Sequence, residues 1–218
     1  RVAHERADTS FIVDEEVILE VGDFDIYEVD VPAGESELKV TMVYPDPPGT
    51  TSATLHRIND LDLKVTSPSG NVYYGNWGLK EANYSSPGGE PNDVDTVENV
   101  FVENPEAGIW EVEVSAPEIN QDAHLDTSED DATFALVVTG GTSQLTQPSE
   151  GRVRMDKETY SCDDRIEIRV IDGNVGSSTV PVTIWSDTEP GGESLVLSET
   201  GPDAGKYSGE IFTTADPA

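Results

Sequence analysis

Residues 37–44 read Glu-Leu-Lys-Val-Thr-Met-Val-Tyr, and polar and apolar side chains alternate from Glu37 through Met42. Successive side chains of an extended strand point to opposite faces of a sheet, so this period of two predicts a half-buried β-strand. The turn sequence Pro45-Asp46-Pro47-Pro48-Gly49 follows directly and ends the strand. Segment 37–44 therefore favours an all-β fold, and this prediction requires the same alternation in other segments of the chain.

The same alternation recurs on both sides of this segment, separated by turns rich in Pro, Gly, Asn and Asp. It predicts strands at 12–13, 16–21, 24–31, 37–44, 62–66, 72–74, 97–102, 109–114 and 132–139. So many short strands in about 140 residues are typical of a sandwich or jelly roll. We therefore predict a jelly-roll β-sandwich over residues 1–141.

The stretch 140–149 is small, polar and uncharged, a composition typical of a linker, and we place the linker at residues 142–150. Beyond it, strands are predicted at 152–155, 165–171, 181–186, 194–198 and 206–213. Their spacing resembles an immunoglobulin-like β-sandwich over 151–218. Because such a sandwich takes about 100 residues, we expect this module to be truncated, or to be completed by another segment or chain.

The charge balance is strongly acidic, with 44 Asp and Glu against 12 Lys and Arg and a formal net charge of -32. This charge would repel nucleic-acid phosphates and anionic membrane surfaces, and no apolar run approaches the roughly 20 residues of a membrane span. Self-repulsion predicts that the fold needs screening salt or bound divalent cations. A solvated acidic coat accounts for most of the individual carboxylates.

The sequence contains no residue pattern that indicates a catalytic site. The three histidines, His4, His56 and His124, have no evident nucleophile beside them, and together with one cysteine they give no zinc-ligand pair. Cys162 has no partner for a disulfide within the chain. The chain starts at Arg1 without a signal sequence, so we expect a fragment of a longer precursor. No catalytic residue is predicted.

Two acidic segments have the composition of a calcium site, which takes six to eight oxygen ligands. In Asn59-Asp60-Leu61-Asp62-Leu63 the leucines can face a core while the carboxylates project from the other side, and a second segment spans 92–99. Ordinary acidic loops are the alternative interpretation. The residues predicted to bind Ca²⁺ are Asn59, Asp60, Asp62, Asp95 and Glu98.

Segments 38–49, 58–65, 67–76, 97–100 and 105–110 together resemble, in the same order, the C-terminal β-domain of alkaline, oxidatively stable subtilisin-like proteases. That domain is a jelly roll similar to the P-domain of proprotein convertases. The resemblance covers roughly residues 8–141. It implies an extracellular location, bound calcium, and catalysis by an upstream subtilisin domain of the same precursor.

Within this resemblance, the family's Asn-Asp-Leu-Asp-Leu segment falls on 59–63 and its Asn-Val-Glu-Asn segment on 96–99, where this chain has Thr96. The acidic segment 122–131 is unusual and is interpreted as an adaptation to salt. Gly141-Thr142-Ser143 is similar to the nucleophile segment of subtilisins, but it follows a predicted strand inside a linker, so we reject that role.

In the second region, 192–202 resembles a bacterial extracellular module of no settled activity. In such modules a cysteine at the place of Cys162 could pair with one further downstream. A buried free thiol is the alternative.

We therefore expect a secreted, calcium-binding accessory region that stabilises the protease and contacts its protein substrate, and that is not an enzyme by itself. The alternative is an adhesive module that binds carbohydrate or another polymer. Its candidate contact residues are Tyr73, Tyr74, Trp77 and Tyr84, for which packing at the core or its rim is the competing explanation. A hydrolase using paired acids is a third hypothesis, and no pair stands out.

Overall fold

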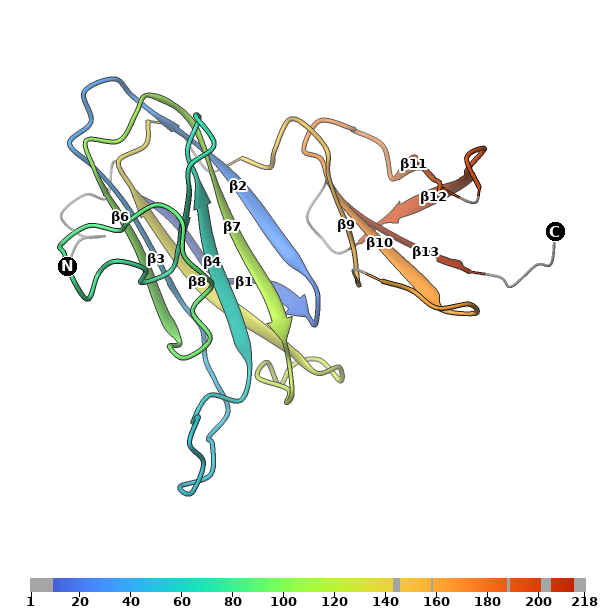
Figure 1. Ribbon diagram of the computed structural model, residues 1–218, viewed down its shortest axis with the longest axis horizontal. Helices are drawn as coiled ribbons and strands as arrows, with labels where there is room; N and C mark the ends of the chain where they lie inside the picture. Colours follow the sequence, from blue (N-terminus) through green and yellow to red (C-terminus); the bar gives the residue numbers. More distant parts are fainter. Residues whose placement is uncertain (1–9, 143–145, 158, 188, 201–204, 214–218) are drawn as a thin grey trace. The chain divides into compact units, whose positions relative to one another are not determined.

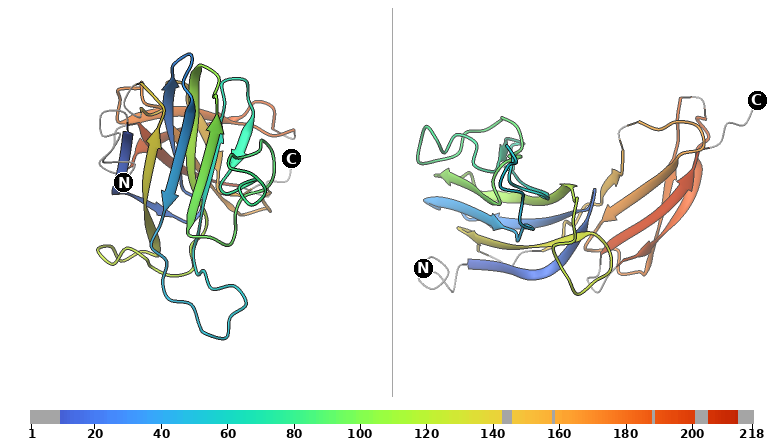
Figure 2. Two further views of the ribbon diagram at one scale, coloured as in Figure 1. Left: turned by 90° about the vertical axis from the view of Figure 1, so that its left-hand side faces the viewer. Right: turned by 90° about the horizontal axis from the view of Figure 1, so that it is seen from below.

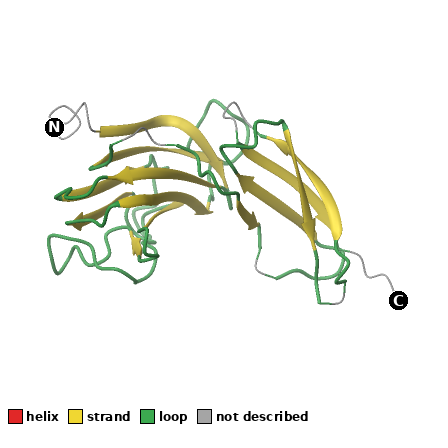
Figure 3. Cartoon of the chain, turned by 90° about the horizontal axis from the view of Figure 1, so that it is seen from above, coloured by secondary structure: helices red, strands yellow, loops and turns green. Residues whose placement is uncertain are grey.

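The computed structural model describes residues 10–142, 146–157, 159–187, 189–200 and 205–213, with the backbone alone for 10–16. Every regular element in these ranges is a β-strand, and Figure 3 shows strands and loops without a helix. None of the described residues forms a helix long and apolar enough to cross a membrane. The predicted all-β class is confirmed.

The chain divides into two compact units, Arg1–Thr146 and Gln147–Ala218. The boundary falls inside the segment 142–150 that the sequence predicts as a linker. Two residues of this segment are attached to the first unit: the amide of Thr142 donates to the carbonyl of Asp30 at 2.9 Å, and Thr146 forms a bridge with Glu28. Ser143 lies outside the described residues.

The first unit contains eight strands: β1 (Ser10–Glu20), β2 (Phe24–Val31), β3 (Glu37–Val43), β4 (Asp60–Thr66), β5 (Val72–Tyr74), β6 (Val97–Glu103), β7 (Gly108–Glu118) and β8 (Asp131–Thr139). They form two antiparallel four-stranded sheets in the orders β1-β8-β3-β6 and β2-β7-β4-β5. Figure 1 shows β2, β7 and β4 side by side in one layer. Eight strands in this order make a jelly roll, as predicted.

The core of the first unit lies between its two sheets. Alternation along β3 buries Leu38, Val40 and Met42 completely, and β4 buries Leu61 and Leu63 from the opposite sheet. These side chains belong to one apolar cluster. Burying each of them contributes about 1.5–3 kcal/mol, which fixes the register of both strands.

The expectation of separate strands at 12–13 and 16–21 is wrong, because β1 runs without interruption. The acidic residues 14–16 break the apolar alternation that the prediction relies on. In the structure, pairing with β8 continues through this stretch with a shift of register between Asp14 and Ile18. A bulge thus replaces the predicted break.

Three long connections belong to the first unit. Residues 44–59 and 119–130 extend from the same end of the sandwich in Figure 2. Residues 75–96 instead fold back on β6, since the amides of Asn76 and Ser85 donate to the carbonyls of Asn99 and Phe101, each at 2.8 Å. This arrangement places the start of β4 and the start of β6 at the end where the loops gather.

The second unit contains β9 (Arg152–Met155), β10 (Arg165–Ile171), β11 (Thr179–Ile184), β12 (Glu193–Glu199) and β13 (Lys206–Phe212). These strands form a single antiparallel sheet in the order β11-β12-β13-β10-β9. Its small core is built on Ile166, Ile168, Val170, Leu197 and Tyr207. The described residues therefore supply one sheet where the immunoglobulin-like interpretation expects two.

Candidate metal centre

Glu98, near the start of β6, reaches from one sheet to the other. Its Oε2 atom accepts a hydrogen bond of 2.8 Å from the backbone amide of Leu63 in β4. The segments 59–63 and 96–99 are far apart in sequence and lie in different sheets, yet this bond joins them directly. The structure thus brings together the two acidic segments that the sequence singles out.

Three carboxylates of this region are withdrawn from solvent without enough hydrogen-bond partners. Glu98 is 0% exposed, Asp60 is 5% exposed, and Asp62 is half-buried. One oxygen of each, Glu98 Oε1, Asp60 Oδ1 and Asp62 Oδ1, is buried and has no hydrogen-bond partner among the described residues. A buried, unsatisfied polar atom is costly in free energy and calls for an explanation.

Burial and mutual repulsion raise the pKa values of these acids. Burial raises the pKa of Glu98 to about 9, against the lowering effect of the Leu63 amide, and Asp62, Asp60 and Asp95 add repulsion. Burial and the charge of Asp60 raise the pKa of Asp62 to about 7. Burial also raises the pKa of Asp60. Without a cation the cluster tends to hold protons, whereas a bound cation would favour the ionised form.

Arg57 supplies positive charge at one side of the cluster. Its Nη2 lies 3.1 Å from Asp60 Oδ2 and its Nη1 lies 2.7 Å from Glu118 Oε2, while Nε donates to the carbonyl of Asp93. Its guanidinium lowers the pKa of Asp60 but does not cancel the effect of burial. Arg57 thus compensates part of the negative charge and leaves Glu98 Oε1 and Asp62 Oδ1 unpartnered.

Gly75 covers the buried end of Glu98. A Cβ atom at this position would lie 2.0 Å from Glu98 Oε2 and 2.7 Å from Glu98 Cβ, so only glycine fits. The next residue, Asn76, has a φ of 61° and donates from Nδ2 to the carbonyl of Val97 at 2.8 Å. The Gly-Asn pair after β5 therefore holds the start of β6 against the carboxylates.

Asn59 and Asp95, also predicted as ligands, have different surroundings. Asn59 is fully buried, but its Oδ1 accepts the amides of Asn120 and Gln121 at 2.8 and 3.1 Å, so its side chain fastens the loop after β7. Asp95 is exposed, and its Oδ2 accepts from Asn92 Nδ2 at 3.0 Å. Repulsion from Asp95 still adds to the raised pKa of Glu98.

Tyr44, Asp46 and Thr96 complete the surroundings of the cluster. Asp46 accepts the amides of Ile58 and Asn59 at 2.9 and 2.8 Å, and the amide of Tyr44 donates to the carbonyl of Thr96 at 3.2 Å. Burial, together with the charge of Asp60, raises the pKa of the Tyr44 hydroxyl. The hydrogen bond from Tyr44 uses the backbone carbonyl of Thr96, so it does not depend on which side chain this position carries.

Arg57, Asp46 and Gly75 contact the cluster or its loops but are not among the site residues predicted from the sequence. A signal for Asp46 was present in the Pro45-Asp46-Pro47 turn, which prevents regular pairing and frees the carboxylate for amides elsewhere. Gly75 gives no local signal, because the atoms that exclude a side chain there belong to Glu98, which is distant in sequence.

The donor atoms of the cluster fit a hard cation such as Ca²⁺. Carboxylate oxygens are the ligands that Ca²⁺, Mg²⁺ and Mn²⁺ prefer. Within the part of the chain that the structure describes, no three His, Cys, Asp or Glu side chains are gathered in the geometry of a formed metal site. Carbonyl oxygens would have to complete any coordination shell that Asp60, Asp62 and Glu98 begin.

The four predicted aromatic contacts do not form one platform. Tyr73 is half-buried and packs on the core, with its ring centroid 6.0 Å from that of Trp110. The Tyr84 hydroxyl donates to Glu37 at 2.8 Å. Tyr74 is half-buried. Trp77 is 45% exposed and lines a surface hollow formed by the connection from β5 to β6. Packing thus accounts for Tyr73, and Trp77 is the most exposed of these four aromatic side chains.

His124 lies near a buried carboxylate in the loop after β7. Its Nδ1 is 3.8 Å from Oδ1 of Asp131, which is 2% exposed, and the hydroxyl of Thr127 donates to Asp131 Oδ2 at 2.5 Å. In a catalytic triad the hydroxyl bonds to the histidine, whereas here it bonds to the acid. The geometry does not make Thr127 a nucleophile activated by His124. His56 is exposed, and His4 lies outside the described residues.

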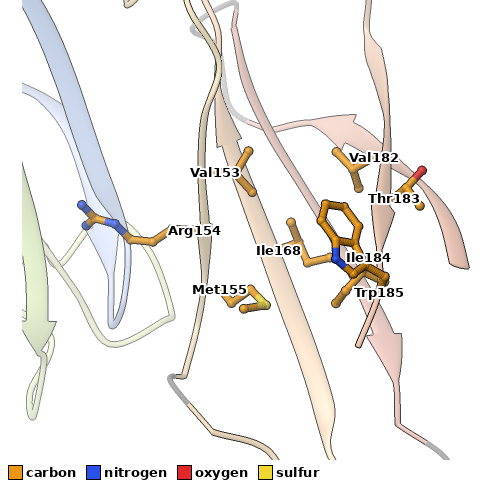
Figure 4. A pocket seen from close by; sticks show the side chains of 8 residues that line it. All are labelled: Val153, Arg154, Met155, Ile168, Val182, Thr183, Ile184 and Trp185. Atoms are coloured by element: carbon orange, nitrogen blue, oxygen red, sulfur yellow. The ribbon is translucent and has the colours of Figure 1, made fainter. Parts of the chain in front are cut away.

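The second unit has a pocket of about 250 Å³ on its apolar side. Figure 4 shows Val153, Met155 and Ile168 turned toward Ile184 and Trp185, whereas Arg154 points away. Val153 and Met155 come from one edge strand of the sheet and Ile184 from the other. Trp185 is 71% exposed. This pocket contains no carboxylate and is unrelated to the acidic cluster.

Cys162 is a free, exposed thiol, so the alternative of a buried thiol is wrong.

Comparisons with known proteins add little to these observations. No protein-family model and no curated protein matches the chain. Among solved structures, it is similar to the lipase BlEst2 of Bacillus licheniformis in its propeptide form, with 13% identity and a TM-score of 0.32 over 92% of this chain. The match covers 43% of the lipase chain. A likeness at this level carries no argument about fold or function.

Proposed function

We propose that this chain is a calcium-binding, non-catalytic accessory region of a secreted subtilisin-like protease. In this function it stabilises the protease through the jelly roll and contacts its protein substrate. The observation that carries the proposal is the set of three buried carboxylate oxygens, from Asp60, Asp62 and Glu98, that lack hydrogen-bond partners.

Electrostatics favour a cation at this place. Like charges a few ångströms apart repel by about 1–4 kcal/mol per pair at effective dielectric constants between those of water and a protein surface. Arg57 forms ion pairs with Asp60 and Glu118 and does not neutralise the unpartnered oxygens of Glu98 and Asp62. A second positive charge is needed there. A calcium ion bound by Asp60, Asp62 and Glu98 would supply that charge and join β4 to β6.

The family resemblance is consistent with this proposal. The segments 58–65 and 97–100 that resemble the protease β-domain are the segments joined by the Glu98 to Leu63 hydrogen bond. In this function the partner is the catalytic domain upstream in the same precursor. A coding sequence that continues upstream of Arg1 into a subtilisin domain with its Asp, His and Ser motifs would support that part of the proposal, and an unrelated upstream sequence would contradict it.

Thermal unfolding tests the calcium site. Addition of Ca²⁺ to chelator-treated protein should raise the free energy of unfolding by about 2.7 kcal/mol at a calcium concentration a hundredfold above the dissociation constant. The variants Asp62→Asn and Glu98→Gln should lose most of this increase, while the exposed-loop control Asp126→Asn should keep it. A melting temperature that is the same in calcium and in chelator would refute the site.

A polymer-binding module is the second candidate, because Trp77 is 45% exposed in a hollow of the surface. Exposed aromatic rings bind sugars and polymeric protein through their apolar faces. Retention on insoluble collagen or polysaccharide that depends on Trp77 would favour this candidate. Equal retention of wild type and Trp77→Ala would argue against it.

A further inference from the structure

Residues 75–95 form a hollow of about 660 Å³ on the surface of the first unit. Its lining combines one aromatic ring with several charges: Trp77, Lys80, Glu81, Glu90, Asp93 and Asp95. The four acids against one lysine give the hollow a net negative charge. It lies above Gly75, which itself covers the buried carboxylate of Glu98.

The indole of Trp77 is held in a fixed place. It lies against Gly89, where a Cβ atom would come within 2.2 Å of Trp77 Cδ2, and Gly89 has a φ of +91° that also requires glycine. The Trp77 amide donates to the carbonyl of Tyr74 at 3.2 Å, and its carbonyl accepts from Ser86 at 3.2 Å. Nearly half of this large apolar side chain nevertheless stays exposed.

Carboxylates that line the same hollow are open to a ligand. Glu81 and Glu90 are exposed, and no hydrogen bond or ion pair of either carboxylate occurs with the described residues. The backbone carbonyl of Asp93 accepts a hydrogen bond from Arg57, so the Asp93 carboxylate takes no part in that bond. An aromatic ring and carboxylates that line the same hollow are complementary to a cation, because the face of an aromatic ring is itself electronegative.

We infer that this hollow binds the cationic side chain of an arginine or lysine in an extended peptide, with the cation against Trp77 and the carboxylates of Glu81, Glu90 and Asp93 around it. This hollow would be the place where the proposed accessory region contacts its substrate. Binding of a cationic peptide does not depend on the proposed function; only the identification of that peptide as a protease substrate does. Calcium binding is read from melting temperature and peptide binding from titration, so either can fail without the other.

Titration of the full 218-residue chain with a blocked Gly-Arg-Gly tripeptide tests the inference, with the neutral isostere Gly-citrulline-Gly as control. Binding is followed by isothermal titration calorimetry at 0.15 M NaCl in saturating calcium, because this readout does not depend on the substituted side chain. The arginine peptide should bind at least about tenfold more tightly than the citrulline peptide. Trp77→Ala should weaken binding about fivefold, and Trp77→Phe should weaken it less. Trp185→Ala, in the other unit, should have no effect.

A matched pair of double variants separates a local site from the overall charge. Glu81→Gln/Glu90→Gln and Asp126→Asn/Asp130→Asn each remove two negative charges, and only the first double variant should weaken binding of the arginine peptide. Equal weakening by both double variants, equal binding of citrulline, or binding that survives Trp77→Ala in a variant with an unchanged melting temperature would overturn the inference. So would Trp77-dependent binding of an oligosaccharide without binding of the arginine peptide.

Discussion

Glu98 and Glu129 carry the same carboxyl group in the same unit, and their surroundings shift its pKa in opposite directions. Glu98 is 0% exposed, and burial raises its pKa to about 9. Glu129 is exposed in the loop after β7, where the hydroxyl and the amide of Ser128 donate to it and lower its pKa. In a chain with a net charge of -32, burial rather than the number of acids therefore distinguishes a candidate cation site.

The largest effect that follows from this contrast is a dependence of stability on pH in the absence of calcium. Because folding raises the pKa of Glu98 from 4.5 to about 9, the folded state binds more protons than the unfolded state within this range. The stability that Glu98 contributes is therefore fully present below pH 4.5 and is lost as the pH rises toward 9, and the contribution of Asp62 is lost by about pH 7. Urea unfolding in chelator at pH 5, 7 and 9 measures this loss.

Glu98→Gln keeps an acceptor for the Leu63 amide but cannot ionise, so it should remove the upper part of this pH dependence. Glu129→Gln should leave the dependence unchanged. Saturating calcium should suppress the loss in the wild type, because the bound ion favours the ionised carboxylates. A stability that rises between pH 5 and pH 9 in chelator would show that these acids are not buried as the structure has them.

Removal of the protein's own cation should have the next largest effect. Arg57 and Asp60 form an ion pair with only 8% of each side chain exposed, so Arg57→Met leaves a buried carboxylate without its partner. We expect a loss of about 3 kcal/mol in chelator and a smaller one in calcium. The exposed pair Arg165 and Glu210 is the control, and Arg165→Met should cost less than about 1 kcal/mol. Equal losses would mean that the burial of Asp60 has no energetic consequence.

Steric exclusion above Glu98 gives a third, smaller effect. A methyl group at Gly75 would overlap Glu98 Oε2, so Gly75→Ala should destabilise the protein by about 2 kcal/mol through forced displacement of β6 or of the carboxylate. Gly191 has no atom within 4 Å of the corresponding position, and Gly191→Ala should be within about 0.5 kcal/mol of wild type. Calorimetric melting of both variants, with and without calcium, provides the comparison.

The sequence allowed the fold of the first unit to be predicted because alternation along strands such as β3 reports burial on one face. It failed in β1, where three acids hide a continuous strand, and in the second unit, where spacing alone did not reveal that the strands form one sheet. For the candidate site, the acids Asp60, Asp62 and Glu98 could be named from composition. Their neighbours Arg57, Asp46 and Gly75 depend on contacts between distant segments, which a local pattern does not contain.

The smallest expected effect belongs to the exposed acids of the loop after β7. Asp126 and Asp130 are exposed, so Asp126→Asn/Asp130→Asn removes two charges without changing a buried contact. Stability should change by less than about 0.5 kcal/mol, with any gain confined to low salt, where repulsion between surface charges is least screened. Denaturation of this variant and of Glu98→Gln at 0.05 and 1 M NaCl distinguishes the two kinds of acid. If the double variant changed stability as much as Glu98→Gln does, stability would depend on net charge and not on burial. That result would contradict the proposal that the buried cluster binds a cation.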